Sequence, residues 1–112
     1  MDKTLRLALA QINPTVGSIK QNSEKIISFI EDAKGLSADI VAFPELCVTG
    51  YPPEDLLLRP SFIKDNLRAL DEIKRHTTAI AAVIGFVDKR DDIYNAAALV
   101  YNGQIVDIYH KE

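Results

Sequence analysis

Three short apolar runs, separated by segments rich in Pro, Gly and charge, predict buried strands. They occupy residues 5–12, 38–43 and 79–87, and Pro44 directly follows the second of them. Runs of this length bounded by turn-forming residues favour strands over helices. The charged residues 88–92 after the third run predict a solvated turn.

Two other segments repeat their apolar residues at helical spacing. The first predicts a helix that begins at Ser18, whose spacing to Gln21 matches a capping box, and that ends at Gly35, a suitable C-terminal cap. Residues 61–76 predict a second amphipathic helix. Between the two, the prolines and acids of residues 52–58 suit only a helical turn or two.

The order of these elements predicts how the strands pair. A strand, a helix and a second strand in direct succession form a βαβ unit, so the first two strands should lie parallel and be covered on both faces. Asn102 and Gly103 give the strongest short-range signal for a two-residue turn, and the apolar stretches 94–101 and 104–109 flank them. We therefore expect an antiparallel hairpin there, in an α/β domain without repeats or linkers.

The composition indicates an ordinary globular domain. Of the 112 residues, 47% are apolar and 26% are charged, and 13 Lys and Arg oppose 16 Asp and Glu for a net charge of -3. Neither sign forms a long block, which argues against nucleic acid or an anionic membrane as a partner. Residues 1–4 lack a secretory signal pattern and no apolar run approaches the ~18 residues of a membrane span, so we predict a cytoplasmic protein.

Two further features concern the single cysteine and the end of the sequence. Cys47 is the only cysteine, so it cannot form an intrachain disulfide, and one thiol with two histidines is too little for a structural zinc site. We expect no metal in this domain. The sequence also stops directly out of a strand pattern at Lys111 and Glu112, so we expect residues 1–112 to be a piece of a longer domain.

Glu45 is the first candidate for chemistry. It lies two residues past a predicted buried strand, inside a loop rich in Pro and Gly. A carboxylate at the mouth of an apolar strand is partly desolvated, which would raise its pKa and make it a better base near neutral pH. On position alone, a helix-capping or salt-bridged loop glutamate is the simpler interpretation.

The residues around Glu45 carry a family resemblance. Pro44-Glu45-Leu46 and Thr49-Gly50-Tyr51, together with Ala10-Gln11 and Tyr109-His110-Lys111, resemble the nitrilase superfamily of carbon-nitrogen hydrolases. The resemblance implies roughly the first half of a four-layer αββα sandwich and a Glu-Lys-Cys triad. By that resemblance Glu45 is the general base, Lys111 stabilises the oxyanion, Tyr51 helps to bind the substrate, and His110 stands where arginine is usual.

The run from Tyr51 to Leu57 narrows the resemblance. Tyr-Pro-Pro-Glu-Asp-Leu-Leu after Thr49-Gly50 is similar to the family of N-terminal glutaminase domains of glutamine-dependent NAD synthetases. That similarity implies glutamine as the substrate and the synthetase domain of the same protein as the partner that receives ammonia for NAD synthesis from deamido-NAD. It implies ATP and Mg in the synthetase domain and no cofactor in this one.

The implied mechanism is acyl transfer through a thioester, which requires a thiol activated by a base and an oxyanion stabilised by a positive charge. Cys47 lies close to Glu45 in sequence, but the family's nucleophile follows the lysine on a separate strand end. A free cysteine is commonly a buried small hydrophobe, so we interpret Cys47 as structural. The nucleophile is then absent from this sequence, and residues 1–112 alone are expected to be inactive.

Two alternatives and one consequence accompany this interpretation. A carbon-nitrogen hydrolase without a synthetase domain would lack an ATP-binding loop further along its reading frame. A non-enzymatic interaction fragment would lack a later cysteine. Half of a sandwich leaves a strand edge and an apolar face uncovered, so we expect these residues to self-associate as a homo-oligomer.

Overall fold

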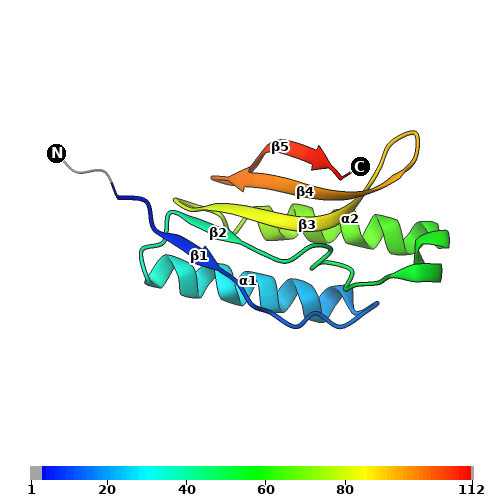
Figure 1. Ribbon diagram of the computed structural model, residues 1–112, viewed down its shortest axis with the longest axis horizontal. Coiled ribbons are helices and arrows are strands. Elements are labelled where there is room, and N and C mark those ends of the chain that lie inside the picture. Colours follow the sequence, from blue (N-terminus) through cyan, green and yellow to red (C-terminus); the bar gives the residue numbers. More distant parts are fainter. Residues whose placement is uncertain (1–3, 112) are drawn as a thin grey trace.

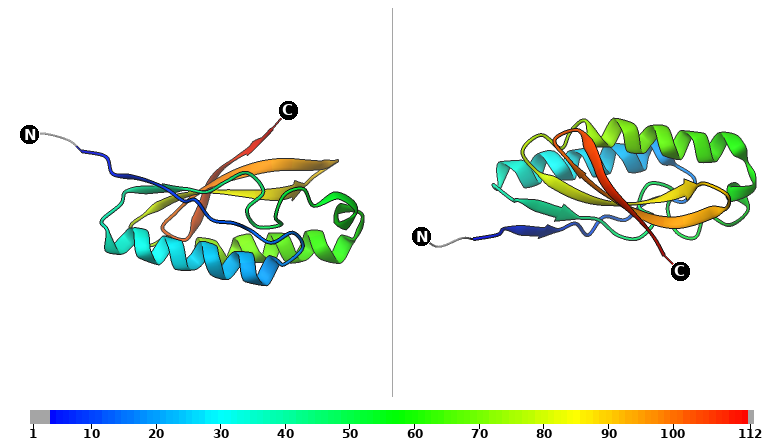
Figure 2. Two further views of the ribbon diagram at one scale, coloured as in Figure 1. Left: turned by 60° about the horizontal axis from the view of Figure 1, so that its bottom comes forward. Right: turned by 90° about the horizontal axis from the view of Figure 1, so that it is seen from above.

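The computed structural model describes residues 4–111 as one mixed five-stranded sheet with two helices on the same side of it (Figures 1 and 2). The elements in chain order are β1 (Leu7–Leu9), α1 (Ile19–Gly35), β2 (Ile40–Ala42), the 3₁₀ helix η1 (Glu54–Leu58), α2 (Pro60–Lys74), β3 (Ala81–Lys89), β4 (Ile93–Tyr101) and β5 (Gln104–His110). Every predicted element is present. The sequence signals assigned to residues 1–3 and to Glu112 lie outside the described residues.

The strands follow one another across the sheet in the order β1-β2-β3-β4-β5. The first three are parallel, which the βαβ pattern predicted for the first two, and β4 and β5 form the predicted antiparallel hairpin. Asn102 and Gly103 turn the chain with φ of 49° and 76°, the left-handed conformations that such a turn requires. The register of β4 with β5 shifts by one residue between Leu99 and Val100, and this bulge leaves Val106 unpaired.

One face of the sheet packs against both helices and forms the core. Fully buried side chains from β2, β3 and β4 meet those of α1 and α2 there. The sheet contributes Val41, Ala82, Ile84, Phe86, Ala98 and Val100, and the helices contribute Ile26, Ile30 and Ile73. This face explains the helical spacing of the apolar residues, since each helix turns one stripe toward the sheet.

The other face, here called the open face, carries Leu7, Leu9, Val83, Leu99 and Tyr109. Within residues 4–111 the first strands are covered on one face only, as expected for half of a sandwich, because both helices lie on the same side (Figure 2). Leu7 and Leu9 are therefore 57% and 68% exposed. Their apolar character indicates a surface that is suited to burial but is uncovered within the described part of the chain.

Two local predictions are also wrong. Ser18 is the N-cap of α1, but its side chain makes no capping hydrogen bond. Asn22 instead uses its buried amide to bind the backbone of Thr15 and the carbonyl oxygen of Val48, at 2.7 to 3.0 Å. Asp88, predicted to lie in a solvated turn, belongs to β3 and is only 5% exposed. Its carboxylate pairs with His110, 22 residues later in the sequence.

Candidate active site

The loop after β2 lies directly on β3, and Gly85 makes this approach possible. Val48 donates its backbone N–H to the carbonyl oxygen of Gly85 at 3.2 Å. A Cβ atom at Gly85 would lie 2.5 Å from the nitrogen of Leu46 and 2.6 Å from the oxygen of Pro44. Only a residue without a side chain permits such a close backbone approach. Gly85 thereby positions the loop that carries Glu45.

Glu45 and Lys111 form an ion pair although 66 residues separate them. The ammonium nitrogen Nζ of Lys111 lies 2.9 Å from Oε1 of Glu45. Lys111 directly follows β5, and its backbone N–H donates to the carbonyl oxygen of Asn95 on β4 at 2.8 Å. The fold thus brings together the two side chains that the sequence indicated as a base and a charge stabiliser.

Asn95 is a third member of this site that the sequence interpretation missed. Its amide nitrogen Nδ2 donates a hydrogen bond to Oε1 of Glu45, the same oxygen that Lys111 contacts. The available signal was a single asparagine within the apolar strand stretch 94–101. Nothing local in the sequence identifies its partner, because Glu45 reaches it through a loop that crosses β3.

The contacts reverse the expected shift of the Glu45 pKa. The hydrogen bond from Lys111 and then that from Asn95 lower the pKa of Glu45, and they outweigh the opposing effect of burial. The hydrogen bond and the charge of Glu45 raise the pKa of Lys111 in turn. Both groups are therefore charged near neutral pH. The prediction of a raised pKa for Glu45 is wrong, because nearly half of its side chain is exposed and two donors stabilise the carboxylate.

A hollow of about 230 Å³ adjoins the ion pair. Its lining combines the charged pair with apolar and small residues from the loop after β2 and from β3, β4 and β5, namely Phe43, Pro44, Glu45, Val83, Gly85, Asn95, Ala96, Ala97, Tyr109 and Lys111. A concave apolar site with a few convergent polar groups is the usual form of a small-molecule site. Tyr51 is 65% exposed outside this lining, yet it contributes to the raised pKa of Lys111. Its role in binding substrate stays a prediction.

Cys47 lies in the same loop but in a different environment. Its side chain is fully buried, and Sγ donates a weak hydrogen bond to the carbonyl oxygen of Gly85 at 3.4 Å. Burial raises the pKa of the Cys47 thiol to about 12. A thiol with this pKa is protonated at neutral pH and is a poor nucleophile. These observations support the interpretation of Cys47 as a packing residue.

His110, the residue before Lys111, contacts two side chains on the opposite face of the sheet. Nε2 of His110 lies 2.7 Å from Oδ2 of Asp88, and the imidazole stacks on the ring of Tyr94 at 4.2 Å between centroids. Side chains alternate between faces along a strand, so His110 points toward the helices while Lys111 points to the open face. The end of β5 is therefore held from both sides.

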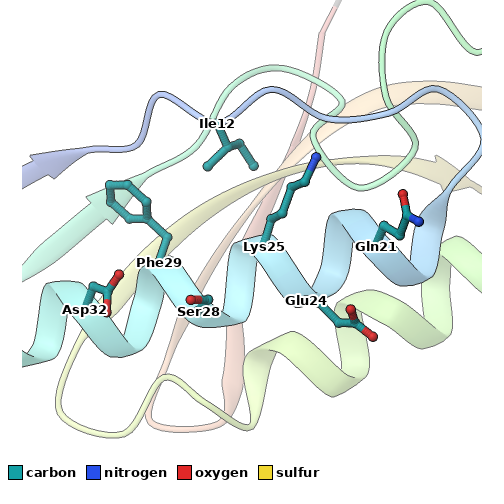
Figure 3. Close-up of a pocket in the computed structure, with 7 residues that line it drawn as sticks. All are labelled: Ile12, Gln21, Glu24, Lys25, Ser28, Phe29 and Asp32. Atoms are coloured by element: carbon teal, nitrogen blue, oxygen red, sulfur yellow. The ribbon is translucent and has the colours of Figure 1, made fainter.

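A second hollow, of about 470 Å³, lies along α1 and shares no lining residue with the hollow beside Glu45 and Lys111 (Figure 3). It is lined by Ile12, Gln21, Glu24, Lys25, Ser28, Phe29 and Asp32. Lys25 reaches across it and donates to the carbonyl oxygen of Asn13 at 2.9 Å.

Within residues 4–111, no three His, Cys, Asp or Glu side chains gather closely enough to hold a metal ion. No helix of that range has the length and apolar character of a membrane span.

Comparison with known proteins assigns this chain to one family and to relatives that share one description. Residues 6–112 match the model of the carbon-nitrogen hydrolase family. The glutamine-dependent NAD(+) synthetase of Thermotoga maritima is 43% identical over 111 residues, which cover 97% of this chain and 19% of that protein. The solved glutamine-dependent NAD+ synthetase of Acinetobacter baumannii, in complex with ADP, superposes with a TM-score of 0.92 at 40% identity, over 98% of this chain and 21% of that chain.

A more distant structure bears on the fold alone. An amidase from Nesterenkonia sp. superposes with a TM-score of 0.83 at 24% identity, covering 96% of this chain and 42% of that chain. Together these likenesses confirm the predicted fold class, roughly the first half of a four-layer αββα nitrilase-type sandwich. The chain spans about a fifth of the length of the synthetases it matches.

Proposed function

The chain belongs to the carbon-nitrogen hydrolase family, and from this premise we propose that it is the N-terminal part of a glutaminase domain in a glutamine-dependent NAD synthetase. The observation that carries the proposal is the ion pair of Glu45 with Lys111 beside a hollow on the open face. The glutamine specificity rests on the synthetases that share about 40% of their residues with this chain.

In the first half of the proposed reaction, Glu45 accepts the thiol proton of a cysteine from beyond residue 112. The thiolate attacks the side-chain amide carbon of glutamine, and a carbon-sulfur bond forms. The ammonium group of Lys111 stabilises the negative charge that develops on the carbonyl oxygen. Glu45 then returns the proton to the amide nitrogen as the carbon-nitrogen bond breaks, so ammonia leaves and a thioester remains.

In the second half of the proposed reaction, a water molecule hydrolyses the thioester. Glu45 accepts a proton from the water molecule, whose oxygen attacks the thioester carbon, and Lys111 again stabilises the oxyanion. The carbon-sulfur bond breaks, glutamate leaves, and the proton on Glu45 passes to the sulfur. The lowered pKa of Glu45 supports this role, because the group must be ionised at the start of each half.

The ammonia would serve ATP-dependent synthesis of NAD from deamido-NAD in the remainder of the full-length protein. The Acinetobacter relative binds ADP, which supports a nucleotide site in proteins of this kind. We propose that ATP and Mg bind in the synthetase domain and that no step of glutamine hydrolysis in this domain uses them. We also propose that the protein is cytoplasmic and that the isolated residues 1–112 are inactive, because they lack the nucleophile.

The test is glutamine hydrolysis by the full-length protein, measured as ammonia release. We expect wild-type activity, and we expect Glu45→Gln and Lys111→Ala to lose it while they keep their folded circular dichroism spectrum. Asp107→Asn, on the same face of β5, is a matched control that should retain activity. Wild-type rates in both Glu45→Gln and Lys111→Ala would refute the proposal.

A further inference from the structure

Asn95 makes contacts with both members of the ion pair, and this double contact is the basis of the inference. Its side chain donates to Glu45, and its backbone carbonyl oxygen accepts from the N–H of Lys111. Resting on the proposed function, we infer that Asn95 is a positioning residue that occupies Oε1 of Glu45 and thereby reserves Oε2 for proton transfer.

The distribution of donors on the carboxylate supports this assignment. A carboxylate only accepts hydrogen bonds, so the amide nitrogen of Asn95 must face it. The donors from Asn95 and Lys111 converge on Oε1. Within residues 4–111, no donor contacts Oε2. The two oxygens are therefore unequal, and the one without a partner is the one that can receive a proton without first losing a hydrogen bond.

The position of Asn95 in the sheet makes the arrangement rigid. Asn95 pairs with Val87 of β3 on one side and is joined to Lys111 on the other, so neighbours on both sides fix its backbone. It is only half-buried, but its strand is the fourth of five and is hydrogen-bonded along both edges. A donor on such a strand fixes the orientation of Glu45 more firmly than a loop residue could.

Without Asn95, Lys111 alone would have to hold the Glu45 carboxylate and stabilise the oxyanion. The lysine must stabilise the oxyanion of the reacting amide, which requires its ammonium group to face the substrate as well as Glu45. The second donor keeps the carboxylate in place and ionised when Lys111 turns part of its hydrogen bonding toward the substrate. Loss of Asn95 should therefore affect proton transfer more than substrate binding.

The experiment compares Asn95→Ala and Asn95→Asp with Tyr94→Phe in the full-length protein. Tyr94→Phe removes a neighbouring hydrogen bond to Asp91 without touching Glu45, so it is a matched control. We expect kcat for glutamine hydrolysis to fall by about ten- to a hundredfold in Asn95→Ala with little change in KM. The acid limb of the pH profile should move to higher pH, and further in Asn95→Asp, which places a second carboxylate beside Glu45.

Two results would overturn the inference. One is an acid limb in Asn95→Ala that coincides with those of wild type and Tyr94→Phe, whatever the change in kcat. The other is an equal effect of all three variants. If wild-type protein does not hydrolyse glutamine, the proposed function fails, and the role of Asn95 is then decided by ¹³C-carboxyl NMR titration of Glu45. In that case a pKa of Glu45 that does not rise in Asn95→Ala would refute it.

Discussion

Gly85→Ala is the substitution whose effect on the candidate active site follows most directly from the structure. The added Cβ would lie 2.5 Å from the nitrogen of Leu46 and 2.6 Å from the oxygen of Pro44. Ordinary contact distances are about 3.5 Å, so the loop must withdraw from β3 by about 1 Å. Both obstructing atoms belong to the backbone, and no side-chain rotation can relieve the overlap.

The expected cost has two parts. Overpacking of this kind destabilises a fold by about 1–3 kcal/mol, which urea denaturation followed by circular dichroism would measure. A shift of about 1 Å in Glu45 can reduce a reaction rate by about a hundredfold, which the glutaminase assay of the full-length protein would measure. The loss of rate should persist under conditions where the variant is fully folded.

Gly35→Ala is the matched control, since a Cβ there meets no atom within 4 Å. It lies at the end of α1 and should leave activity unchanged, with stability equal to wild type or greater by up to about 1 kcal/mol. Equal urea midpoints and equal rates for Gly85→Ala and Gly35→Ala would show that the approach of the loop to β3 does not position Glu45.

Four further outcomes can be checked. Asn22→Ala removes the three hydrogen bonds of a buried amide and should lower the free energy of unfolding by about 2–4 kcal/mol, against a change within about 0.5 kcal/mol for the exposed Asn13→Ala, both by urea denaturation. Cys47 should resist thiol reagents until the protein unfolds, and Cys47→Ala should retain glutamine hydrolysis, so a loss of turnover would contradict its packing role. Burial raises the pKa of Asp88, but hydrogen bonds from His110 and Arg90 outweigh it and set the pKa below its ordinary value. The stability that Asp88 contributes is therefore present above pH ~4 and is lost as pH falls through the lowered pKa, and Asp88→Asn should flatten this acid dependence. Residues 1–112 alone should sediment as a self-associating species and Leu9→Lys should weaken the association, whereas a monodisperse wild-type monomer would contradict this.

The features that the sequence predicted correctly are those decided by near neighbours. Asn102 and Gly103 specify their turn by themselves, because both adopt the left-handed conformation that the turn requires. The strand before Pro44 likewise follows from local periodicity and from the proline that interrupts it. The first helix ends at Gly35 as predicted, but Leu36 and not Gly35 is its C-cap. Such signals need no knowledge of the rest of the fold.

The features that were missed depend on partners distant in the chain. The buried Asp88 carboxylate pairs with His110, 22 residues later, and the charged run 88–92 contains only its second partner, Arg90. Asn95 entered no prediction because its partner, Glu45, lies 50 residues earlier. Glu45 itself was found through motif resemblance, whereas its lowered pKa depends on a contact that only the folded chain makes.

The bulge in β5 determines which face of the sheet receives Lys111. With Val106 unpaired, Asn95 shares its face with Lys111, and Ala96 shares the opposite face with His110. If the register set by the hairpin turn continued unchanged, His110 would lie beside Asn95 on the open face and Lys111 would point into the helices. Leaving Val106 unpaired, at a distance from both side chains, therefore gives Glu45 a lysine rather than a histidine as its partner. Pairing Val106 with Leu99 would exchange the two, whereas deleting Val106 would remove the bulge and leave Lys111 beside Asn95.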